Sequence, residues 1–544
     1  MKKSITFLCA LILGLSSLNF NNAYADNEHE TLVIMGTTDV HGHVYAYDYY
    51  TGKDDNKGLA KISTKVKEIR SKYKNTLLVD SGDFLQGTPL VGFYGTHEIN
   101  IVNPIIMAMN IMNYTALGIG NHEYDYGLGN LQKAKKDAKF PFLSANTYHY
   151  KTKKLVFEPY TIKEVNGIKV GIIGFTTPGT AIWDRNIVEK NYDFGDIIEA
   201  GKKYIPELRK KCDVLIAIPH SGYETEKGNE GYDAKSTGIA EENVGKNLAE
   251  NFPQIDALFL GHTHTEIKEK FNNGVIITQA DKFANKLAIV TMDLDKKNGK
   301  WTVNKKKSEL FDVKDTESDK EITENIKKYH DQIVKYVNTS IGKSDEEWKS
   351  DKSRFEDTPL MDLINKVQKE TAKTDLSTAS LFSDTSFIPK GNVSIANIAG
   401  LYIYENSLYA IKITGKQLKS YLEQSAKFFD SVEGGVIKTN KKIPGFNYDM
   451  VSGVDYKIDL TQPIGNRIKD LKFKGKNVSD GMLFTMALNS YRQSGGGGYD
   501  MIKNCEVIYN KQESIRDLLI NYVQQNKNLI KNDIFVKNWE LILK

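Results

Sequence analysis

Short apolar runs recur through the first half of the chain, and they lack the polar alternation of a half-exposed strand. The runs cover residues 32–35, 76–79, 116–119, 170–173, 214–218 and 257–260. A polar loop follows each run, and a helical pattern often follows the loop. Uninterrupted apolar runs of this length are typical of strands that helices cover on both faces. The pattern therefore predicts a layered α/β domain, which we place at residues 26–314.

A charged segment follows this domain, and its apolar residues are spaced as on one face of a helix. They are Ile322, Ile326, Tyr329, Ile333 and Val337. This spacing predicts a linker helix within residues 315–342, which is also the candidate hinge between two domains. Residues 343–544 then mix helix and strand patterns with glycine-rich loops. They predict a second, smaller domain of mixed α/β structure.

The first residues of the chain carry the pattern of an exported protein. Lys2 and Lys3 precede an apolar run over residues 5–18, and Ala23 and Ala25 follow it at a small-x-small cleavage site. The run is too short to span a bilayer, so the pattern predicts a signal peptide over residues 1–25. We expect a secreted or cell-envelope protein, extracellular or periplasmic, with no integral membrane segment after cleavage.

Charge and cysteine content limit the partners of the protein. The formal net charge is +4 over 544 residues, which is too small to indicate binding to a nucleic acid polymer. We therefore expect small-molecule substrates and a monomeric protein. Beyond the signal segment only Cys212 and Cys505 remain, so the sequence predicts no disulfide framework. A single bond between these two cysteines stays an open alternative.

Potential metal ligands follow several of the apolar runs within a few residues. They are Asp39, His41, Asp83, Asn121, His220, His262 and His264. Residues just past the carboxyl ends of separate parallel strands converge on one edge of a sheet. Any one of them alone would be read as a helix cap or a satisfied polar group. Together they exceed the four ligands that one zinc ion usually takes, so we expect two divalent ions, manganese, zinc or similar.

The order and spacing of these residues resemble the five motif blocks of the calcineurin-like metallophosphoesterase superfamily. The blocks here are Asp39-Val40-His41, Gly82-Asp83, Gly120-Asn121-His122-Glu123, His220 and Gly261-His262-Thr263-His264. The resemblance implies a four-layer α+β sandwich. It also implies that Asp39, His41, Asp83 and His264 hold one ion, and that Asp83, Asn121, His220 and His262 hold the other. Asp83 would then bridge the two ions.

His122 and Asp125 resemble the catalytic dyad of that superfamily. His122 lies beside a predicted ligand without being one, and Asp125 follows three residues later. An imidazole that a carboxylate orients can stabilise charge on a phosphoryl group or protonate a leaving oxygen. The alternative is an ordinary structural pair of a histidine and an aspartate.

The second half of the chain resembles the C-terminal domain of the 5′-nucleotidase family. The similar blocks include Tyr404-Glu405-Asn406-Ser407-Leu408, Pro444-Gly445-Phe446-Asn447-Tyr448-Asp449 and Asn489-Ser490-Tyr491-Arg492. By this resemblance nucleotides are the substrates, Tyr448 and Tyr499 clamp the base, and Asn406 and Arg492 contribute to substrate binding. The chain holds 29 tyrosines, so both could instead be ordinary core or surface residues.

Within that family, the blocks around Tyr448 and Tyr491 look more like the branch that acts on cyclic nucleotides. This branch opens 2′,3′-cyclic nucleotides to 3′-nucleotides and hydrolyses the 3′-nucleotides to nucleoside and phosphate. One alternative is a 5′-nucleotidase or UDP-sugar hydrolase, although Ser494 and the four glycines after it depart from the pattern of that branch. Another alternative is a secreted binding protein that keeps the fold without the chemistry.

Overall fold

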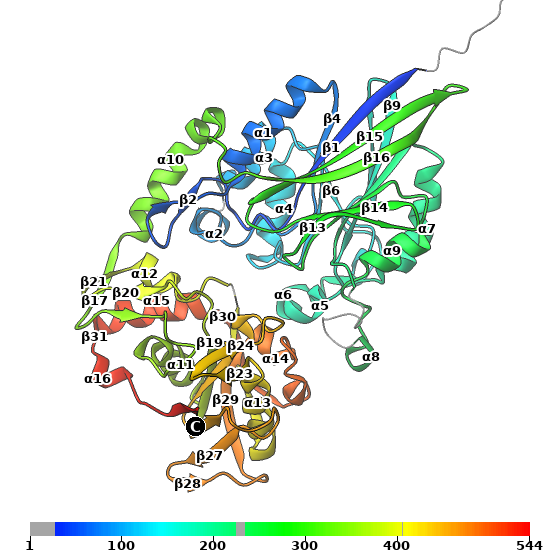
Figure 1. The fold of residues 1–544 in the computed structure, drawn as a ribbon. Helices are drawn as coiled ribbons and strands as arrows, with labels where there is room; N and C mark the ends of the chain where they lie inside the picture. Colours follow the sequence, from blue (N-terminus) through cyan, green and yellow to red (C-terminus); the bar gives the residue numbers. More distant parts are fainter. Residues whose placement is uncertain (1–27, 99, 225–233, 405, 544) are drawn as a thin grey trace, which may run out of the picture.

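The computed structural model describes residues 28–98, 100–224, 234–404 and 406–543. The predicted signal peptide over residues 1–25 lies outside these ranges. The chain forms two domains, one coloured blue to green and the other yellow to red in Figure 1, with helix α10 (Lys320–Val337) running down one side.

The N-terminal domain contains two six-stranded sheets. The strands of the first sheet, in spatial order, are β16 (Lys300–Asp312), β15 (Lys286–Lys297), β1 (His29–Thr37), β4 (Asn75–Asp80), β5 (Ala116–Gly118) and β6 (Phe142–Leu143). Those of the second are β13 (Glu266–Asn272), β14 (Val275–Ala280), β12 (Ala257–Leu260), β11 (Val214–His220), β9 (Ile168–Thr176) and β8 (Tyr160–Val165). Each apolar run of the sequence therefore lies within or against one of these strands.

Three hydrophobic clusters show how the layers pack. Leu32 and Ile34 of β1 face the second sheet, where they share a cluster with residues such as Phe259. Val33 and Met35, which alternate with them, belong to the cluster that includes α1 (Leu59–Lys72), α2 (Pro89–Thr96), α3 (Pro104–Ile111) and α4 (Gly127–Asp137). A third cluster joins the second sheet to α7 (Ile197–Arg209) and α9 (Gly245–Asn251). The layers are helix, sheet, sheet and helix, which confirms the predicted four-layer sandwich.

Strand direction brings the predicted ligands to one edge of the domain. Strand β4 runs parallel to both β1 and β5. In the second sheet β11 runs parallel to β9 and β12. The loops after these strands therefore leave at the same end of both sheets, and they carry the metal-ligand motifs.

Helix α10 packs on the N-terminal domain more closely than a free linker would. Its buried residues Ile322, Ile326, Ile333 and Val337 belong to the cluster that contains α2 and α3. Only residues 338 and 339 separate it from β17 (Ser340–Ser344), which pairs with β21 (Gly391–Ser394) in the C-terminal domain. Bending within α10 would therefore disturb a packed core.

The C-terminal domain has one hydrophobic cluster of its own. Its main sheet consists of β25 (Asp449–Ser452), β19 (Leu376–Ser380), β29 (Leu483–Asn489), β22 (Ser407–Thr414) and β30 (Val507–Ser514). Helices α11 (Pro359–Ala372) and α13 (Gly415–Ala426) pack against this sheet. A smaller sheet contains β28 (Lys476–Asn477), β27 (Ile468–Phe473), β26 (Asp455–Asp459) and β32 (Trp539–Ile542). The mixed α/β prediction for this domain is confirmed.

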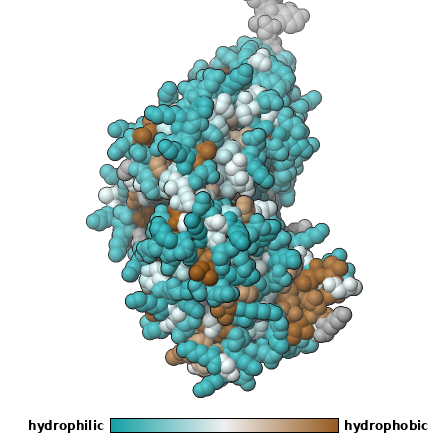
Figure 2. Space-filling view, turned by 90° about the vertical axis from the view of Figure 1, so that its left-hand side faces the viewer, coloured by the Kyte–Doolittle hydropathy of each residue, from teal (hydrophilic) through white to brown (hydrophobic). Residues whose placement is uncertain are grey.

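Two further expectations concern cysteines and the surface. Cys212 and Cys505 are both free thiols, so the alternative of a bond between them is not realised. Within the described ranges, no helix is both long and apolar enough to cross a membrane. The face shown in Figure 2 is mostly hydrophilic, with apolar side chains in small separate groups and one larger group at its lower right.

Candidate metal centre

Six of the seven predicted ligands form two compact groups. Asp39, His41 and His264 make one group, and Asp83, His220 and His262 make the other; within each, the potential ligand atoms lie within 4.8 Å of one another. In the first, Nε2 of His41 lies 3.1 Å from Nε2 of His264. In the second, Nε2 of His220 lies 3.0 Å from Oδ2 of Asp83. Each group contains three of the four residues predicted to hold one ion; Asp83 is not part of the first group.

The backbone at these ligands is unusual, because five of them adopt the left-handed conformation that favours glycine. The φ angles are 49° at Asp39, 46° at His41, 62° at Asp83, 74° at His262 and 52° at His264. Such conformations cost about 1–3 kcal/mol each and persist only where the surroundings hold them. Their concentration in three loops at one sheet edge is typical of a functional site.

Hydrogen bonds between the loops hold this backbone in place. The N–H of Asp39 donates to the carbonyl of Gly82 at 2.9 Å, and the N–H of His41 donates to the carbonyl of Asp83 at 2.9 Å. The N–H of His262 donates to the carboxylate of Asp39 at 3.1 Å. The loops after β1, β4 and β12 therefore form one unit, in which each ligand is oriented by its neighbours.

Close approach explains the glycine at position 120. A Cβ atom there would lie 2.1 Å from Oδ1 of Asp83. The carboxylate of Glu123 occupies the other side of this turn and accepts hydrogen bonds from the N–H groups of Gly120, Asp83 and Phe84 at 2.6, 2.9 and 2.7 Å. Glu123 therefore shapes the loop that presents Asp83. Its place in the Gly120–Glu123 block was the signal available in the sequence.

The residues present fit divalent metal ions. Oδ1 of Asn121 is buried and has no hydrogen-bond partner among the described residues, as expected of an oxygen that is a metal ligand. Burial lowers the pKa of His41 to about 3, so its imidazole is neutral. Although burial opposes the shift, His220 and His122 lower the pKa of Asp83 well below its usual range. Neutral imidazole and ionised carboxylate are the forms that bind metals.

His122 and Asp125 are in contact, as predicted. Nδ1 of His122 lies 2.9 Å from Oδ2 of Asp125, and the His122 N–H donates to Oδ1 of Asp83 at 2.8 Å. The side chain of His122 is 29% exposed, so its outer edge is open to a substrate, unlike that of a purely structural histidine. The rings of His41 and His122 are 5.3 Å apart, which places the dyad beside the first ligand group.

Asp184 supplies a second carboxyl group next to this dyad, which the sequence did not predict. Burial, together with the nearby Asp125 carboxylate, raises the pKa of Asp184 well above its usual range. A protonated Asp184 donates to Asp125, which in turn accepts from His122. Asp184 lies 59 residues after Asp125 at the start of α6 (Arg185–Val188), and no motif marks it.

The structure contradicts the predicted base clamp. Tyr448 and Tyr499 are both 0% exposed. The ring of Tyr448 stacks on Phe428 with centroids 5.1 Å apart, and the hydroxyl of Tyr499 bonds to Oγ of Ser425 at 2.6 Å and donates to the carbonyl of Asn447 at 3.0 Å. Both rings therefore belong to the core of the C-terminal domain, and neither face is free to stack on a base.

Arg492 is also internal rather than a substrate contact. It is 1% exposed, and its guanidinium donates to the two carboxylate oxygens of Asp449 at 3.0 and 2.7 Å. It also donates to the carbonyl of Phe446 at 3.1 Å and packs over the ring of Tyr499 at 4.1 Å. This bidentate pair fixes the loop before β25. Asn406 is half-buried at the start of β22, where its carbonyl accepts from the N–H of Ile515 at 3.1 Å.

Three other aromatic residues of the same motif blocks are only half-buried. They are Tyr404, Phe446 and Tyr491, and the rings of Tyr404 and Phe446 are 6.4 Å apart. Burial and the nearby Tyr491 raise the pKa of Tyr404. Burial also raises the pKa of Tyr491, and the charge of Glu242 in the N-terminal domain adds to this shift. Tyr491 is therefore close enough to the N-terminal domain for its hydroxyl to be affected by the charge of Glu242.

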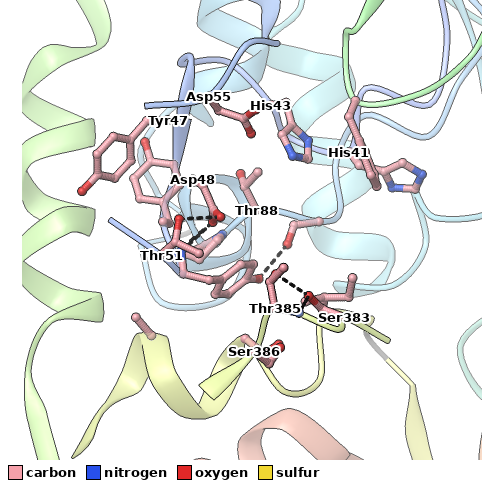
Figure 3. Close-up of a pocket in the computed structure, with 18 of the residues that line it drawn as sticks. His41, His43, Tyr47, Asp48, Thr51, Asp55, Thr88, Ser383, Thr385 and Ser386 are labelled. Carbon is pink, nitrogen blue, oxygen red and sulfur yellow. Dashed lines mark hydrogen bonds between the residues drawn. The ribbon is translucent and has the colours of Figure 1, made fainter. Parts of the chain in front are cut away.

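A cavity of about 230 Å³ lies between the domains on the outer side of His41. Figure 3 shows His41, His43, Tyr47, Asp48 and Thr88 of the N-terminal domain on one wall, with Ser383, Thr385 and Ser386 of the C-terminal domain on the other. Gln86 also lines it and joins it to the centre, because Oε1 of Gln86 accepts from Nδ1 of His41 at 2.9 Å.

Comparison with known proteins defines the class. Residues 32–266 match the calcineurin-like phosphoesterase family, and residues 340–504 match the 5′-nucleotidase C-terminal domain. The chain therefore belongs to the 5′-nucleotidase family of calcineurin-like phosphoesterases, and it is a metal-dependent phosphoesterase.

Particular relatives are similar over nearly the whole chain. A 2′,3′-cyclic-nucleotide 2′-phosphodiesterase/3′-nucleotidase of Haemophilus influenzae is 30% identical, over 98% of this chain and 90% of its own length. The protein of that name from Salmonella typhimurium is 31% identical, over 90% of this chain and 85% of its own. A crystal structure of a putative 5′-nucleotidase from Staphylococcus aureus, 24% identical, shares the fold with a TM-score of 0.82, over 94% of this chain and 100% of that one.

Proposed function

We propose that the protein uses two metal ions to open 2′,3′-cyclic nucleotides and then to hydrolyse the resulting 3′-nucleotides to nucleoside and phosphate. The observation that carries this proposal is the pair of ligand groups beside the His122–Asp125 contact. The choice of substrate draws on the near full-length similarity to relatives named for this activity.

One ion would be held by Asp39, His41, Asp83 and His264, and the other by Asp83, Asn121, His220 and His262. Two bound divalent ions, manganese, zinc or similar, would polarise the phosphate oxygens and lower the pKa of a water molecule between them. The remaining work falls to the side chains, which orient the ester and move protons.

His122 is the candidate general acid. Asp125 holds its Nδ1, so Nε2 is directed toward the open side of the centre and can deliver a proton. In the first step the oxygen of a water molecule bonds to phosphorus, the bond to the 2′ oxygen breaks, and that oxygen takes the proton of His122; the proton that the water loses passes to solvent, from which His122 is reprotonated. In the second step another water attacks in the same way, the bond to the 3′ oxygen breaks, and that oxygen takes the proton, so that nucleoside and phosphate are released.

The nucleobase would stack on the half-buried aromatic group of the C-terminal domain, chiefly Tyr404 and Tyr491. Aromatic faces stack on any base, at about 1–3 kcal/mol per base in nucleic-acid binders, so this contact supports binding with little base preference. The partly exposed Asn406 lies two residues from Tyr404 and remains a candidate polar contact to the substrate.

The first experiment measures phosphate and nucleoside release from 2′,3′-cyclic AMP, 3′-AMP and 5′-AMP with added manganese. We expect turnover of the first two. In His122→Ala we expect kcat about 10²–10⁴-fold lower, because the general acid is lost, with both ions still bound. Dominant hydrolysis of 5′-AMP would favour the 5′-nucleotidase alternative. No turnover with manganese or zinc would favour the binding-protein alternative.

We also propose that the protein is exported. N-terminal sequencing of the protein from culture medium or from the cell envelope tests this. A mature N-terminus at Asp26 is expected from the small-x-small site at Ala23 and Ala25. Recovery only from the cytosol with Met1 intact would contradict export.

A further inference from the structure

We propose that Glu242 is a positioning residue for the second ion: its carboxylate holds His262 so that Nδ1 of the ring faces Asp83 and His220. The inference rests on the proposed function, because it assigns a partner to one of the proposed ligands. Glu242 belongs to none of the motif blocks, and it lies 20 residues before His262 in the chain.

The contact between the two side chains is short and sheltered. Nε2 of His262 lies 2.7 Å from Oε1 of Glu242, and the two side chains are only 12% and 10% exposed. A carboxylate can only accept at this position, so Nε2 must carry the proton. The nitrogen left with a free lone pair is Nδ1, and His262 belongs to the ligand group of Asp83 and His220.

The backbone of Glu242 is tied to the loop that carries another ligand of the same ion. The carbonyl of Glu242 accepts from Oγ of Ser221 at 2.8 Å, directly after His220. The same Oγ accepts from the N–H of Val244 at 2.9 Å, and Oδ1 of Asn243 accepts from the N–H of Gly222 at 2.9 Å. These hydrogen bonds join the backbone around Glu242 to the residues that follow His220, and so they fix the position from which the Glu242 side chain reaches His262.

The remaining faces of His262 are also occupied. The ring of Trp183 lies 5.3 Å from that of His262 at an interplanar angle of 33°, and the ring of His220 lies 5.2 Å away. The imidazole thus packs against two rings and is held at Nε2 by Glu242. A histidine held in this way donates through one nitrogen and binds a metal through the other, and such partners typically change metal affinity about 10–100-fold.

Binding of Mn²⁺ to the metal-free full chain tests this role directly. Calorimetric titration, with manganese per chain counted after desalting, is compared for the wild type, Glu242→Gln, Glu242→Ala and the exposed neighbour Glu241→Gln as control. We expect the wild type and Glu241→Gln to bind two ions. In Glu242→Ala the first ion should bind normally and the second about 10–100-fold more weakly. Glu242→Gln should lie between, because it keeps an acceptor without the charge.

A kinetic readout separates positioning from other roles. Raising the manganese concentration should restore most of the activity of Glu242→Ala, because the ligands of the ion are intact. Wild-type affinity for both ions in Glu242→Ala would overturn the inference. A change in KM alone for Glu242→Ala at saturating manganese would also overturn it, because Glu242 would then act on substrate binding through Tyr491 and not on the metal ion. If the wild type itself binds one ion or is inactive, the proposed function fails instead.

Discussion

At the scale of single residues, the metal centre combines side chains that suit an ion with a backbone that would otherwise be strained. Five ligands sit at positive φ, and inter-loop hydrogen bonds such as that from His41 to Asp83 hold them there. The cost of about 1–3 kcal/mol for each is borne by the surrounding fold. The surrounding loops therefore orient the ligands.

The aromatic residues of the C-terminal domain yield a residue-scale prediction. Tyr404→Ala and Tyr491→Ala should raise KM for 3′-AMP with little change in kcat, because they remove ground-state stacking on the base. Tyr448→Ala and Tyr499→Ala should instead lower the free energy of unfolding by about 3–5 kcal/mol, as truncated core aromatics do. Steady-state kinetics and denaturant unfolding of all four variants distinguish the two pairs.

The opposite pattern would restore the base clamp at Tyr448 and Tyr499. A stable Tyr499→Ala variant with a large increase in KM would mean that the ring leaves the core when substrate binds. Phe382→Ala controls for the loss of an aromatic ring next to Tyr404, because Phe382 packs against Tyr404 but lies outside the motif blocks.

At the scale of elements, the C-terminal tail is joined to helix α11 by the buried carboxyl group of Asp362 and to the segment before this helix by the half-buried carboxyl group of Asp357. Oδ2 of Asp362 accepts from the N–H of Val536 at 2.8 Å, and Oδ2 of Asp357 accepts from the N–H of Asn538 at 2.8 Å. Burial raises the pKa of Asp357 to about 6, and burial together with Asp357 raises that of Asp362 to about 7. The tail is therefore held by groups that ionise within the folded protein near neutral pH.

The direction of these shifts predicts a pH dependence. A raised pKa means that the folded state binds the proton more tightly, so stability is present at low pH and is lost as pH rises to about 7. Asp362→Asn keeps an acceptor for Val536 and cannot ionise. Between pH 5 and pH 8 the melting temperature of this variant should therefore fall less than that of the wild type. The difference expected from one such group is about a few degrees.

Melting curves at several pH values, read from the signal of the C-terminal domain, measure this difference. Asp480→Asn, on an exposed turn, provides a matched control for the change of charge. Parallel pH profiles for the wild type and Asp362→Asn would show that Asp362 does not contribute to the loss of stability.

At the scale of the whole molecule, every proposed ligand lies in the N-terminal domain, while the aromatic group lies in the C-terminal domain. Each domain has a large hydrophobic cluster of its own, and they meet at Ala396 of the C-terminal domain, which joins the N-terminal cluster, and at Tyr336, which packs against both. Metal binding should therefore stabilise chiefly the N-terminal domain, by about 2.7 kcal/mol for each ion when free metal is at 100 times its dissociation constant. Chelation should lower the melting temperature of the N-terminal domain and leave that of the C-terminal domain unchanged.

Differential scanning calorimetry with and without a chelator measures this effect. Asp83→Asn should abolish the shift, because the residue proposed to bridge both ions loses its charge. A single transition that shifts as a whole on chelation would show instead that the two domains unfold as one cooperative unit.

The sequence by itself determined the layered N-terminal domain, the helix at Lys320–Val337 and the grouping of the predicted metal ligands. These features depend on local patterns: uninterrupted apolar runs, one helical stripe, and polar residues placed directly after strands. Parallel strand order then brings such residues together, so their convergence followed from position along the chain.

Only the tertiary structure decided which side chains of a motif are buried and which residues contact the proposed ligands. Tyr448, Tyr491 and Tyr499 are chemically alike in the sequence, and burial alone separates them. Arg492 is held in the core by its ion pair with Asp449, which lies 43 residues away in the chain. Asp184 and Glu242 reach the centre from loops that carry no motif. The physical reason is that burial and long-range pairing arise from packing between distant segments, which a local pattern does not encode.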